Sequence, residues 1–270
     1  MQTLSFAGIF LLALLGAPFF IVMSLVALVA FYFAGTEATV VAVEIYKVAN
    51  APTLITIPLF TFAGYLMAES KSPKRLFDLA DATVGFLPMG MPIVCILVSA
   101  FFTAFTGGSG VTIIALGGLI YPILKHEGYS ENFNLGLIST CGSLGLLFPP
   151  SLPVILYGII AKVDIDKLFK AGILPGILLL LALVVQAYFS GRQTREIRGP
   201  RSFEWQKFVT ALKGARYEVP LPFLVLGGIY GGIITPQEAA ALTALYVLIM
   251  ECFLYKDLSI IKDIHKIVKY

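Results

Sequence analysis

Long runs without a single charged residue alternate with short charged loops in this chain. The runs cover 3–36, 48–68, 82–124, 132–161, 171–191, 219–237 and 239–250. Of the 270 residues, 58% are hydrophobic and 13% are charged, whereas a soluble domain has about 45–50% apolar and about 25% charged residues. One soluble core could not bury this much apolar surface. The composition therefore excludes a soluble enzyme, a secreted disulfide scaffold and a disordered protein. It predicts an all-α polytopic membrane protein surrounded by the lipid bilayer.

Three of these runs predict one membrane-spanning helix each, because a helix needs about 20 apolar residues to cross about 30 Å of hydrocarbon. They are 48–68, 171–191 and 219–237. The longer run 3–36 predicts either one long tilted helix or two short helices broken near 16–18. The sequence leaves both arrangements open.

A further helix is predicted over 239–255, preceded by the pattern of a capping box. Thr235 can cap the helix, and Pro236 suits the first helical position. Glu238, at the third position, can bond back to the cap. These residues mark where the helix starts.

The run 82–124 is interrupted by a glycine-rich segment and does not predict a simple span. The segment consists of Thr106, Gly107, Gly108, Ser109 and Gly110. It separates two apolar arms, 91–105 and 111–124, each about 21–23 Å long at about 1.5 Å per residue, which is too short to cross the bilayer. Three glycines and two hydroxyls favour a tight turn over a helix. We therefore predict a re-entrant helical hairpin over 88–124.

The run 132–161 predicts a helix broken by prolines. Pro149 and Pro150 have no backbone N–H and exclude helical geometry in the residues just before them. The carbonyls of 143–146 are then expected to lack their normal partners. Because an unpaired carbonyl is costly in lipid, such backbone persists only where it faces protein or a polar cavity.

Each interruption also has a purely structural explanation, since glycines allow close helix packing and prolines bend helices. In this chain both occur, separated by the short polar loop 125–131. A hairpin next to a broken helix is typical of secondary transporters, in which helix ends and unwound carbonyls hold substrate and cations near the midplane. The combination favours a binding site.

The positions of lysine and arginine predict how the chain is oriented. If the hairpin turns back, the loops 69–81, 125–131 and 192–218 lie on one side and 162–170 on the other. The first side has eleven Lys and Arg residues and the second has three, so the positive-inside rule places the first side in the cytoplasm. Segment 192–218 is predicted to be a cytoplasmic amphipathic linker. Its part 200–218 is either a helix on the membrane surface or a solvated segment.

The sequence contains no pattern for enzymatic chemistry. No ionisable residue lies in the middle of a predicted span, which argues against a proton relay. His126 and Glu127 lack a second histidine at helical spacing, and no phosphate-binding glycine motif is present. A transporter of this kind would use an ion gradient, and neutral oxygens at the two interruptions suit Na⁺ better than H⁺. The net charge of +3 is spread over loops and indicates no nucleic-acid partner.

Several motifs in a fixed order carry a resemblance to a known family. They are Thr106-Gly107-Gly108-Ser109-Gly110, Tyr121-Pro122, Leu144-Gly145-Leu146-Leu147-Phe148-Pro149-Pro150-Ser151, Leu168-Phe169-Lys170-Ala171-Gly172-Ile173-Leu174-Pro175-Gly176 and Thr235-Pro236-Gln237-Glu238-Ala239-Ala240. The series resembles the large membrane subunit (DctM-like) of the TRAP transporters over nearly the whole chain. Any one motif alone is weak, whereas their order and spacing are specific.

The resemblance implies a permease subunit, not an enzyme, in the bacterial inner membrane. Such importers are expected to move organic acids, such as C4-dicarboxylates, with Na⁺ as the coupling ion and no other cofactor. The expected partners are a small membrane subunit (DctQ-like) and a periplasmic substrate-binding protein (DctP-like). The implied fold is an elevator-type transporter of two inverted repeats, each with a hairpin and a broken helix.

Carried over to this chain, the resemblance assigns 1–191 to the first repeat and 219–270 to the start of a second repeat. A second hairpin and broken helix are not encoded within the 270 residues, so the alternative expectation is a truncated, non-transporting remnant that only packs with partner subunits. The residues expected at the first Na⁺ site and one wall of the substrate site are Thr106, Gly107, Gly108, Ser109, Gly110, Ser143, Gly145, Pro149, Pro150 and Ser151.

Overall fold

The structure is a computed structural model that describes residues 2–87, 89–194, 202–259 and 263. These residues form thirteen α-helices with short 3-10 and π-helical segments, and no strand occurs among them. Within this part of the chain, three helical segments are long and apolar enough to cross a membrane: Ser109–His126, Ile165–Ser190 and Pro236–Leu254. The prediction of an all-α polytopic membrane protein is confirmed.

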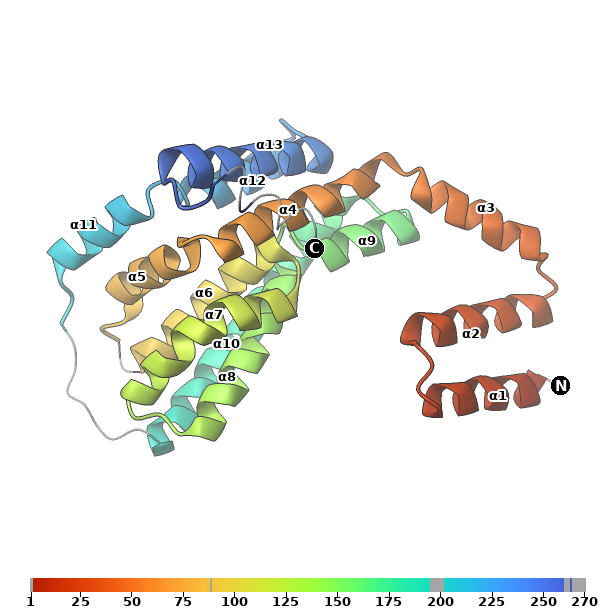
Figure 1. Ribbon diagram of the computed structural model, residues 1–270, viewed down its shortest axis with the longest axis horizontal. Helices are drawn as coiled ribbons and strands as arrows, with labels where there is room; N and C mark the ends of the chain where they lie inside the picture. The colour runs from red at the N-terminus through yellow and green to blue at the C-terminus, as the bar shows by residue number, and fades with distance from the viewer. Residues whose placement is uncertain (1, 88, 195–201, 260–262, 264–270) are drawn as a thin grey trace. The chain divides into compact units, whose positions relative to one another are not determined.

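By packing, the chain divides into two compact units, Met1–Ala51 (unit 1) and Pro52–Tyr270 (unit 2). Unit 1 contains α1 (Gln2–Leu14), α2 (Phe19–Phe33) and α3 (Ala38–Ala49). Helices α1 and α2 lie side by side (Figure 1). The chain reverses between them at Gly16, whose φ of +87° suits glycine. The run 3–36 is therefore two short helices, which decides between the two arrangements left open by the sequence.

In unit 2, several helices pack around one buried helix, α6 (Gly90–Thr106). Its elements are η1 (Pro52–Ile55), α4 (Thr56–Glu69), α5 (Ser72–Val84), α6 (Gly90–Thr106), α7 (Ser109–His126), α8 (Glu131–Leu144), η2 (Gly145–Leu147), α9 (Leu152–Ala161), α10 (Ile165–Thr194), α11 (Trp205–Gly214), α12 (Pro220–Tyr230), α13 (Pro236–Ile249) and η3 (Met250–Leu254). Helix α6 packs against α4, α5, α7, α8 and α10, and 14 of its 17 residues are buried. Its Phe102 and Phe105 join Phe60 of α4 in the apolar core. Protein, not lipid, therefore encloses this arm of the hairpin.

The arms of the hairpin are longer than the sequence suggested. Helix α6 has 17 residues and α7 has 18, so at 1.5 Å per residue they are about 26 and 27 Å long. The added residues are Gly90 and Thr106 in α6, and Ser109, Gly110, Lys125 and His126 in α7. The estimate of 21–23 Å was too short, and the re-entrant character of the hairpin stays a prediction.

The chain bends at the two prolines of the broken helix. Helix α8 continues into the 3-10 turn η2, and α9 starts only at Leu152. The two parts differ in direction by 42°. Residues 148–151 are here called the break, and Pro149 and Pro150 account for it because neither can donate a backbone hydrogen bond.

Helix α12 differs from the prediction for 219–237. It has only 11 residues and ends at Tyr230, so it is about 16 Å long. The chain then turns through Gly232, which has a φ of +67°, and enters α13. The run 219–237 is long enough for one span, but the turn at Gly232 ends α12 and separates it from α13.

The capping box that starts α13 is present as predicted. Replacing Thr235 by alanine should lower the free energy of unfolding by about 0.5–2 kcal/mol. The Thr235 hydroxyl accepts the backbone N–H of Glu238 at 3.3 Å, and the Glu238 carboxylate accepts the backbone N–H of Thr235 at 2.7 Å. Thermal unfolding of the purified chain in detergent measures the loss. Thr210→Ala is the control, because this hydroxyl bonds only within α11. An equal loss in both variants would contradict the capping role.

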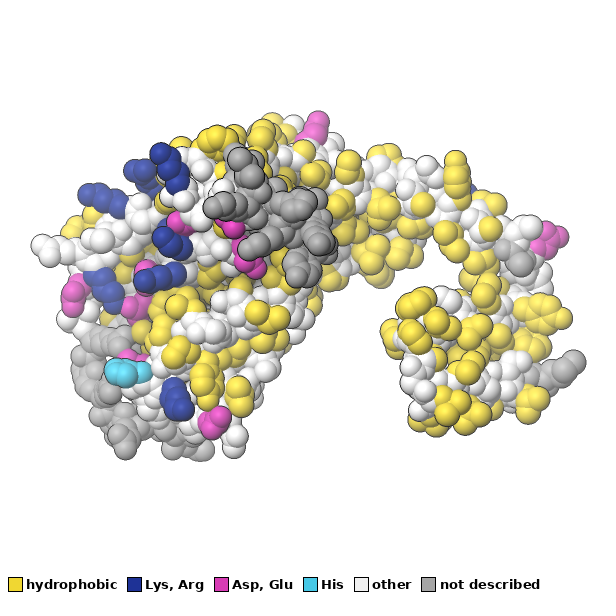
Figure 2. Space-filling model, in the orientation of Figure 1, with side chains coloured by type: hydrophobic (Ala, Val, Ile, Leu, Met, Phe, Trp, Pro, Cys, Tyr) yellow, Lys and Arg dark blue, Asp and Glu magenta, His cyan; other side chains and the backbone are white. Residues whose placement is uncertain are grey.

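Lysine and arginine side chains gather at one end of unit 2. Figure 2 shows them around α5, α11 and the end of α7. Lys207 of α11 forms an ion pair with Asp81 of α5, and Phe86 packs edge-on against Phe203. In the described part of the linker, the segment is thus a helix held against α5. The described Lys and Arg residues around α5, α11 and the end of α7 (Figure 2) thus come from the loops assigned to one membrane side.

Candidate functional site

The turn of the hairpin consists of Gly107 and Gly108, here called the tip. Gly107 has a φ of +63°, a conformation that glycine adopts without strain. A Cβ atom at this position would lie only 2.2 Å from Cγ of Leu152, the first residue of α9. The tip therefore contacts the second half of the broken helix so closely that any side chain would be excluded.

The first half of the broken helix packs against the hairpin just as closely. A Cβ atom on Gly142 would lie 3.2 Å from the carbonyl oxygen of Ser109, and one on Gly145 would lie 2.4 Å from the carbonyl oxygen of Ala100. Gly142, in the last turn of α8, and Gly145, the first residue of η2, lie about one turn apart. The two interruptions in the sequence thus meet in space, and glycines on both sides permit the contact.

The carbonyls before the prolines are not orphaned as expected. In a continuous helix the carbonyls of Gly145 and Leu146 would accept from residues 149 and 150, which are prolines. Instead, the Gly145 carbonyl accepts the backbone N–H of Phe148 at 3.1 Å, and the Leu146 carbonyl accepts the hydroxyl of Ser151. For these two carbonyls the prediction was wrong, because the 3-10 turn and a neighbouring serine supply donors.

The ten predicted site residues differ in accessibility. Those that are buried are Thr106, Gly145, Pro149, Pro150 and Ser151; those that are partly exposed are Gly107, Gly108 and Ser109; and those that are exposed are Gly110 and Ser143. The Ser151 hydroxyl is occupied as a donor to Leu146. The structure therefore places the tip against Leu152, the residue that follows the break, but the ten residues do not line one common surface.

Two further threonines belong to the contact between tip and break, and sequence reasoning missed them. Thr103 of α6 and Thr112 of α7 are 0% and 1% exposed. Their hydroxyl oxygens lie 2.9 Å apart, and the Thr103 hydroxyl lies 3.2 Å from the carbonyl oxygen of Gly142. Thr106 lies 3.0 Å from Thr112. The signal in the sequence was the spacing of Thr103 and Thr106, which places both on one face of a helix.

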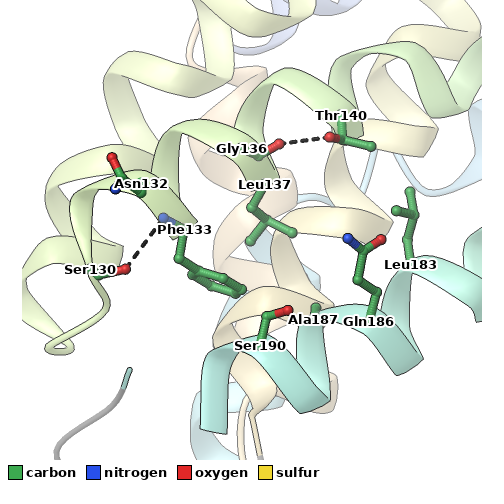
Figure 3. A pocket seen from close by; sticks show the side chains of 10 residues that line it. All are labelled: Ser130, Asn132, Phe133, Gly136, Leu137, Thr140, Leu183, Gln186, Ala187 and Ser190. Carbon is green, nitrogen blue, oxygen red and sulfur yellow. Dashed lines mark hydrogen bonds between the residues drawn. The ribbon is translucent and has the colours of Figure 1, made fainter. Parts of the chain in front are cut away.

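A separate groove of about 400 Å³ lies between α8 and α10. Figure 3 shows Gln186 and Ser190 of α10 facing Leu137 and Thr140 of α8. Its lining residues are Ser130, Asn132, Phe133, Gly136, Leu137, Thr140, Leu183, Gln186, Ala187 and Ser190. None of them is a predicted site residue, so the groove is distinct from the contact between tip and break.

The donor atoms at the contact are neutral oxygens. No cluster of three or more His, Cys, Asp or Glu side chains suited to a metal ion occurs among residues 2–87, 89–194, 202–259 and 263. Hydroxyl and carbonyl oxygens remain near the tip and the break. Such hard, uncharged oxygens suit an alkali cation better than a transition metal, which prefers nitrogen or sulfur ligands.

Comparison with known proteins identifies relatives along nearly the whole chain. A 36% identical protein is the isethionate TRAP transporter permease protein DctMQ of Oleidesulfovibrio alaskensis, where the match covers 92% of this chain and 39% of the relative. The C4-dicarboxylate TRAP transporter large permease protein DctM of Pseudomonas aeruginosa is 33% identical, over 81% of this chain and 51% of the relative. The ectoine TRAP transporter large permease protein TeaC of Halomonas elongata is 32% identical, over 100% of this chain and 63% of the relative. The chain spans about half the length of the relatives that it matches.

A family match gives the same result independently of any single relative. Residues 6–269 match the family described as tripartite ATP-independent periplasmic transporter, DctM component. This range includes the hairpin, the break and α13, whose motifs carry the resemblance. The chain therefore belongs to the DctM family of TRAP transporter large permease proteins, which is a family of transporters and not of enzymes.

Proposed function

We propose that this chain contributes the first half of the translocation site in a Na⁺-coupled importer of organic acids in the bacterial inner membrane. The importer would also contain the second half of the permease, a small membrane subunit and a periplasmic substrate-binding protein, in keeping with the description of the family as tripartite and periplasmic. The same description as ATP-independent leaves an ion gradient as the energy source.

The observation that carries the proposal is the contact between the tip and the break. Non-helical backbone persists inside a bilayer only where it meets protein or lines a cavity. Here it meets a second interrupted segment, at Gly107 against Leu152 and at Gly142 against Ser109. In the proposed site, hydroxyl and carbonyl oxygens from both segments would hold one cation.

The substrate class is inferred from the names of relatives. These include C4-dicarboxylate, isethionate and sialic acid, which support an organic acid as the substrate. A further relative is named for ectoine, so the family includes transporters for more than one chemical class of solute. Uptake assays with a panel of these four solutes would identify the substrate class.

The decisive experiment measures uptake into proteoliposomes that contain the transporter with this chain, its small subunit and its binding protein. Uptake should require an inward Na⁺ gradient and should not be supported by an equal K⁺ gradient. A proton gradient alone should also be insufficient. Uptake that is independent of Na⁺ would overturn the coupling, and no uptake under any gradient would favour a non-transporting subunit.

Removing the accessible hydroxyls at the contact should weaken Na⁺ coupling. Ser109→Ala and Ser143→Ala are each expected to raise the Na⁺ concentration for half-maximal uptake about three- to tenfold, which corresponds to about 0.6–1.4 kcal/mol for one lost ligand. Ser24→Ala is a matched control, because this exposed hydroxyl bonds only to the Phe20 carbonyl in unit 1. An unchanged Na⁺ dependence in both site variants would remove these serines from the site.

A further inference from the structure

A chain of three buried hydroxyls runs beneath the tip and ends on the broken helix. Thr103, Thr106 and Thr112, here called the threonine network, are 0%, 3% and 1% exposed. Thr112 lies between the other two, 2.9 Å from Thr103 and 3.0 Å from Thr106. Thr103 in turn lies 3.2 Å from the carbonyl oxygen of Gly142. The network joins α6, α7 and α8.

The number of protons limits how this network can be arranged. Each hydroxyl has one proton, yet Thr103 has three oxygens within reach, because the Ser99 carbonyl lies at 2.7 Å in addition to Thr112 and Gly142. Thr103 therefore donates to one of these oxygens at a time, Thr112 can donate to the Gly108 carbonyl, and either hydroxyl of the Thr106–Thr112 pair can be the donor. However the protons are arranged, Thr112 is the hydroxyl that lies within hydrogen-bond distance of both Thr103 and Thr106.

The threonine network lies where it can set the distance between the tip and α8. Thr112 also lies 3.3 Å from the carbonyl oxygen of Gly108, which is part of the tip. Gly142, at the other end, has Ser109 and Ile113 as its closest neighbours. The network therefore contacts both the tip and the last turn of α8 before η2. A change of a few tenths of an ångström in this spacing would alter the distances that a bound cation requires.

We infer that Thr112 and Thr103 are positioning residues of the cation site: they do not bind the ion themselves but fix the distance between the tip and the broken helix. The inference rests on the proposed function. It adds two buried residues, whereas the predicted Ser109 and Ser143 are accessible. The hydroxyls, and not the side-chain volume, are the groups that matter.

The test compares variants that separate the hydroxyl from the volume. Thr112→Val keeps the shape but removes both links, and Thr112→Ser keeps the hydroxyl. Thr243→Val is the matched control, because Thr243 is equally buried and its hydroxyl bonds only to the Ala239 carbonyl within α13. Na⁺-dependent uptake, half-saturation by loaded binding protein, and melting temperature are measured for each, in the transporter assembled with its partner subunits.

Thr112→Val should raise the Na⁺ concentration for half-maximal uptake about five- to tenfold. Half-saturation by loaded binding protein at high Na⁺ should change less than about twofold. Thr112→Ser should restore the Na⁺ dependence to within about twofold of the wild type, and Thr243→Val should leave it unchanged. A melting temperature that falls equally in Thr112→Val and Thr243→Val, with no shift in Na⁺ dependence, would overturn the inference.

Two further outcomes separate this inference from the proposed function. If the wild type shows no Na⁺ dependence at all, the proposed function fails and the inference fails with it. If the wild type is Na⁺-dependent but Thr112→Val does not fold, Thr103→Val decides, because it removes the links to Gly142 and Thr112, together with the bond to Ser99 within α6, and leaves Thr112 bonded to Thr106. A normal Na⁺ dependence in that variant would overturn the positioning role and leave the proposed function intact.

Discussion

Replacing Arg75 by alanine should prevent the chain from accumulating as folded protein. The guanidinium of Arg75, in α5, contacts the carboxylates of Glu218, Glu251 and Asp257. Its Nη2 atom lies 2.9 Å and 3.0 Å from the two oxygens of Glu251. The guanidinium of Arg75 thus contacts three acidic side chains that come from a distant part of the chain.

The expected effect is large because the partners of Arg75 are cut off from water. Glu218 and Glu251 are 0% exposed, so their charges depend on Arg75, on the Ser72 hydroxyl, which lies 3.0 Å and 2.8 Å from them, and, for Glu218, on the Tyr255 hydroxyl at 2.6 Å. Removing one partner of a buried ion pair typically costs about 3–5 kcal/mol, because an uncompensated charge stays buried. That loss is a large fraction of the total stability of a typical domain.

Size-exclusion profiles and thermal unfolding in detergent would measure this effect. Lys71→Ala is the matched control: Lys71 also pairs with Asp257, at 3.4 Å, but its side chain is 76% exposed, so the expected change is below about 1 kcal/mol. Combining Arg75→Met with Glu218→Gln and Glu251→Gln should recover much of the stability, because the two fully buried carboxylates are then replaced by neutral amides and Asp257 keeps Lys71 as its partner. A stable Arg75→Ala variant would show that water reaches the cluster.

Gly145→Ala should disrupt the contact between the broken helix and α6. The added Cβ would lie 2.4 Å from the carbonyl oxygen of Ala100, 2.5 Å from Cβ of Thr103 and 2.6 Å from the backbone nitrogen of Ala104. Two of these three atoms belong to the backbone of a buried helix and cannot rotate away. The helices must therefore separate, at an expected cost of about 1–3 kcal/mol or more.

The same substitution at a neighbouring glycine provides the control. Gly136 lies in the middle of α8, and a Cβ there would meet nothing within 4 Å. Gly136→Ala should leave uptake unchanged and stabilise the helix by up to about 1 kcal/mol, since alanine favours helix more than glycine does. Gly145→Ala should lose both stability and Na⁺-dependent uptake. If the two variants behave alike, the close packing of α8 on α6 does not matter for function.

Local patterns predicted a part of this fold because they act over a few residues. The capping box at Thr235 and Glu238 depends on groups three residues apart, and it is present. The bend at Pro149 and Pro150 depends on two missing N–H groups, and the chain bends there by 42°. The predicted site also follows from local patterns, because glycine and proline interrupt helices wherever they occur.

The failures of prediction concern the exact ends of helices or partners that the patterns did not specify. The Leu146 carbonyl accepts a hydrogen bond from the Ser151 hydroxyl. The turn of the hairpin contains only two glycines, because Ser109 and Gly110 belong to α7. Arg75 meets Asp257 across 182 positions of sequence. No periodicity or spacing could have paired residues so far apart.

The sequence by itself determined that the chain is helical, lies in a membrane and belongs to the DctM family, because apolar composition and ordered motifs act regardless of how the helices pack. It also determined where the backbone must bend, since proline lacks a donor and glycine tolerates positive φ. Only the tertiary structure decided which oxygens face one another. Hydrogen bonds such as that from Thr103 to Gly142 need atoms within about 3 Å, and that proximity arises only when separate helices pack together.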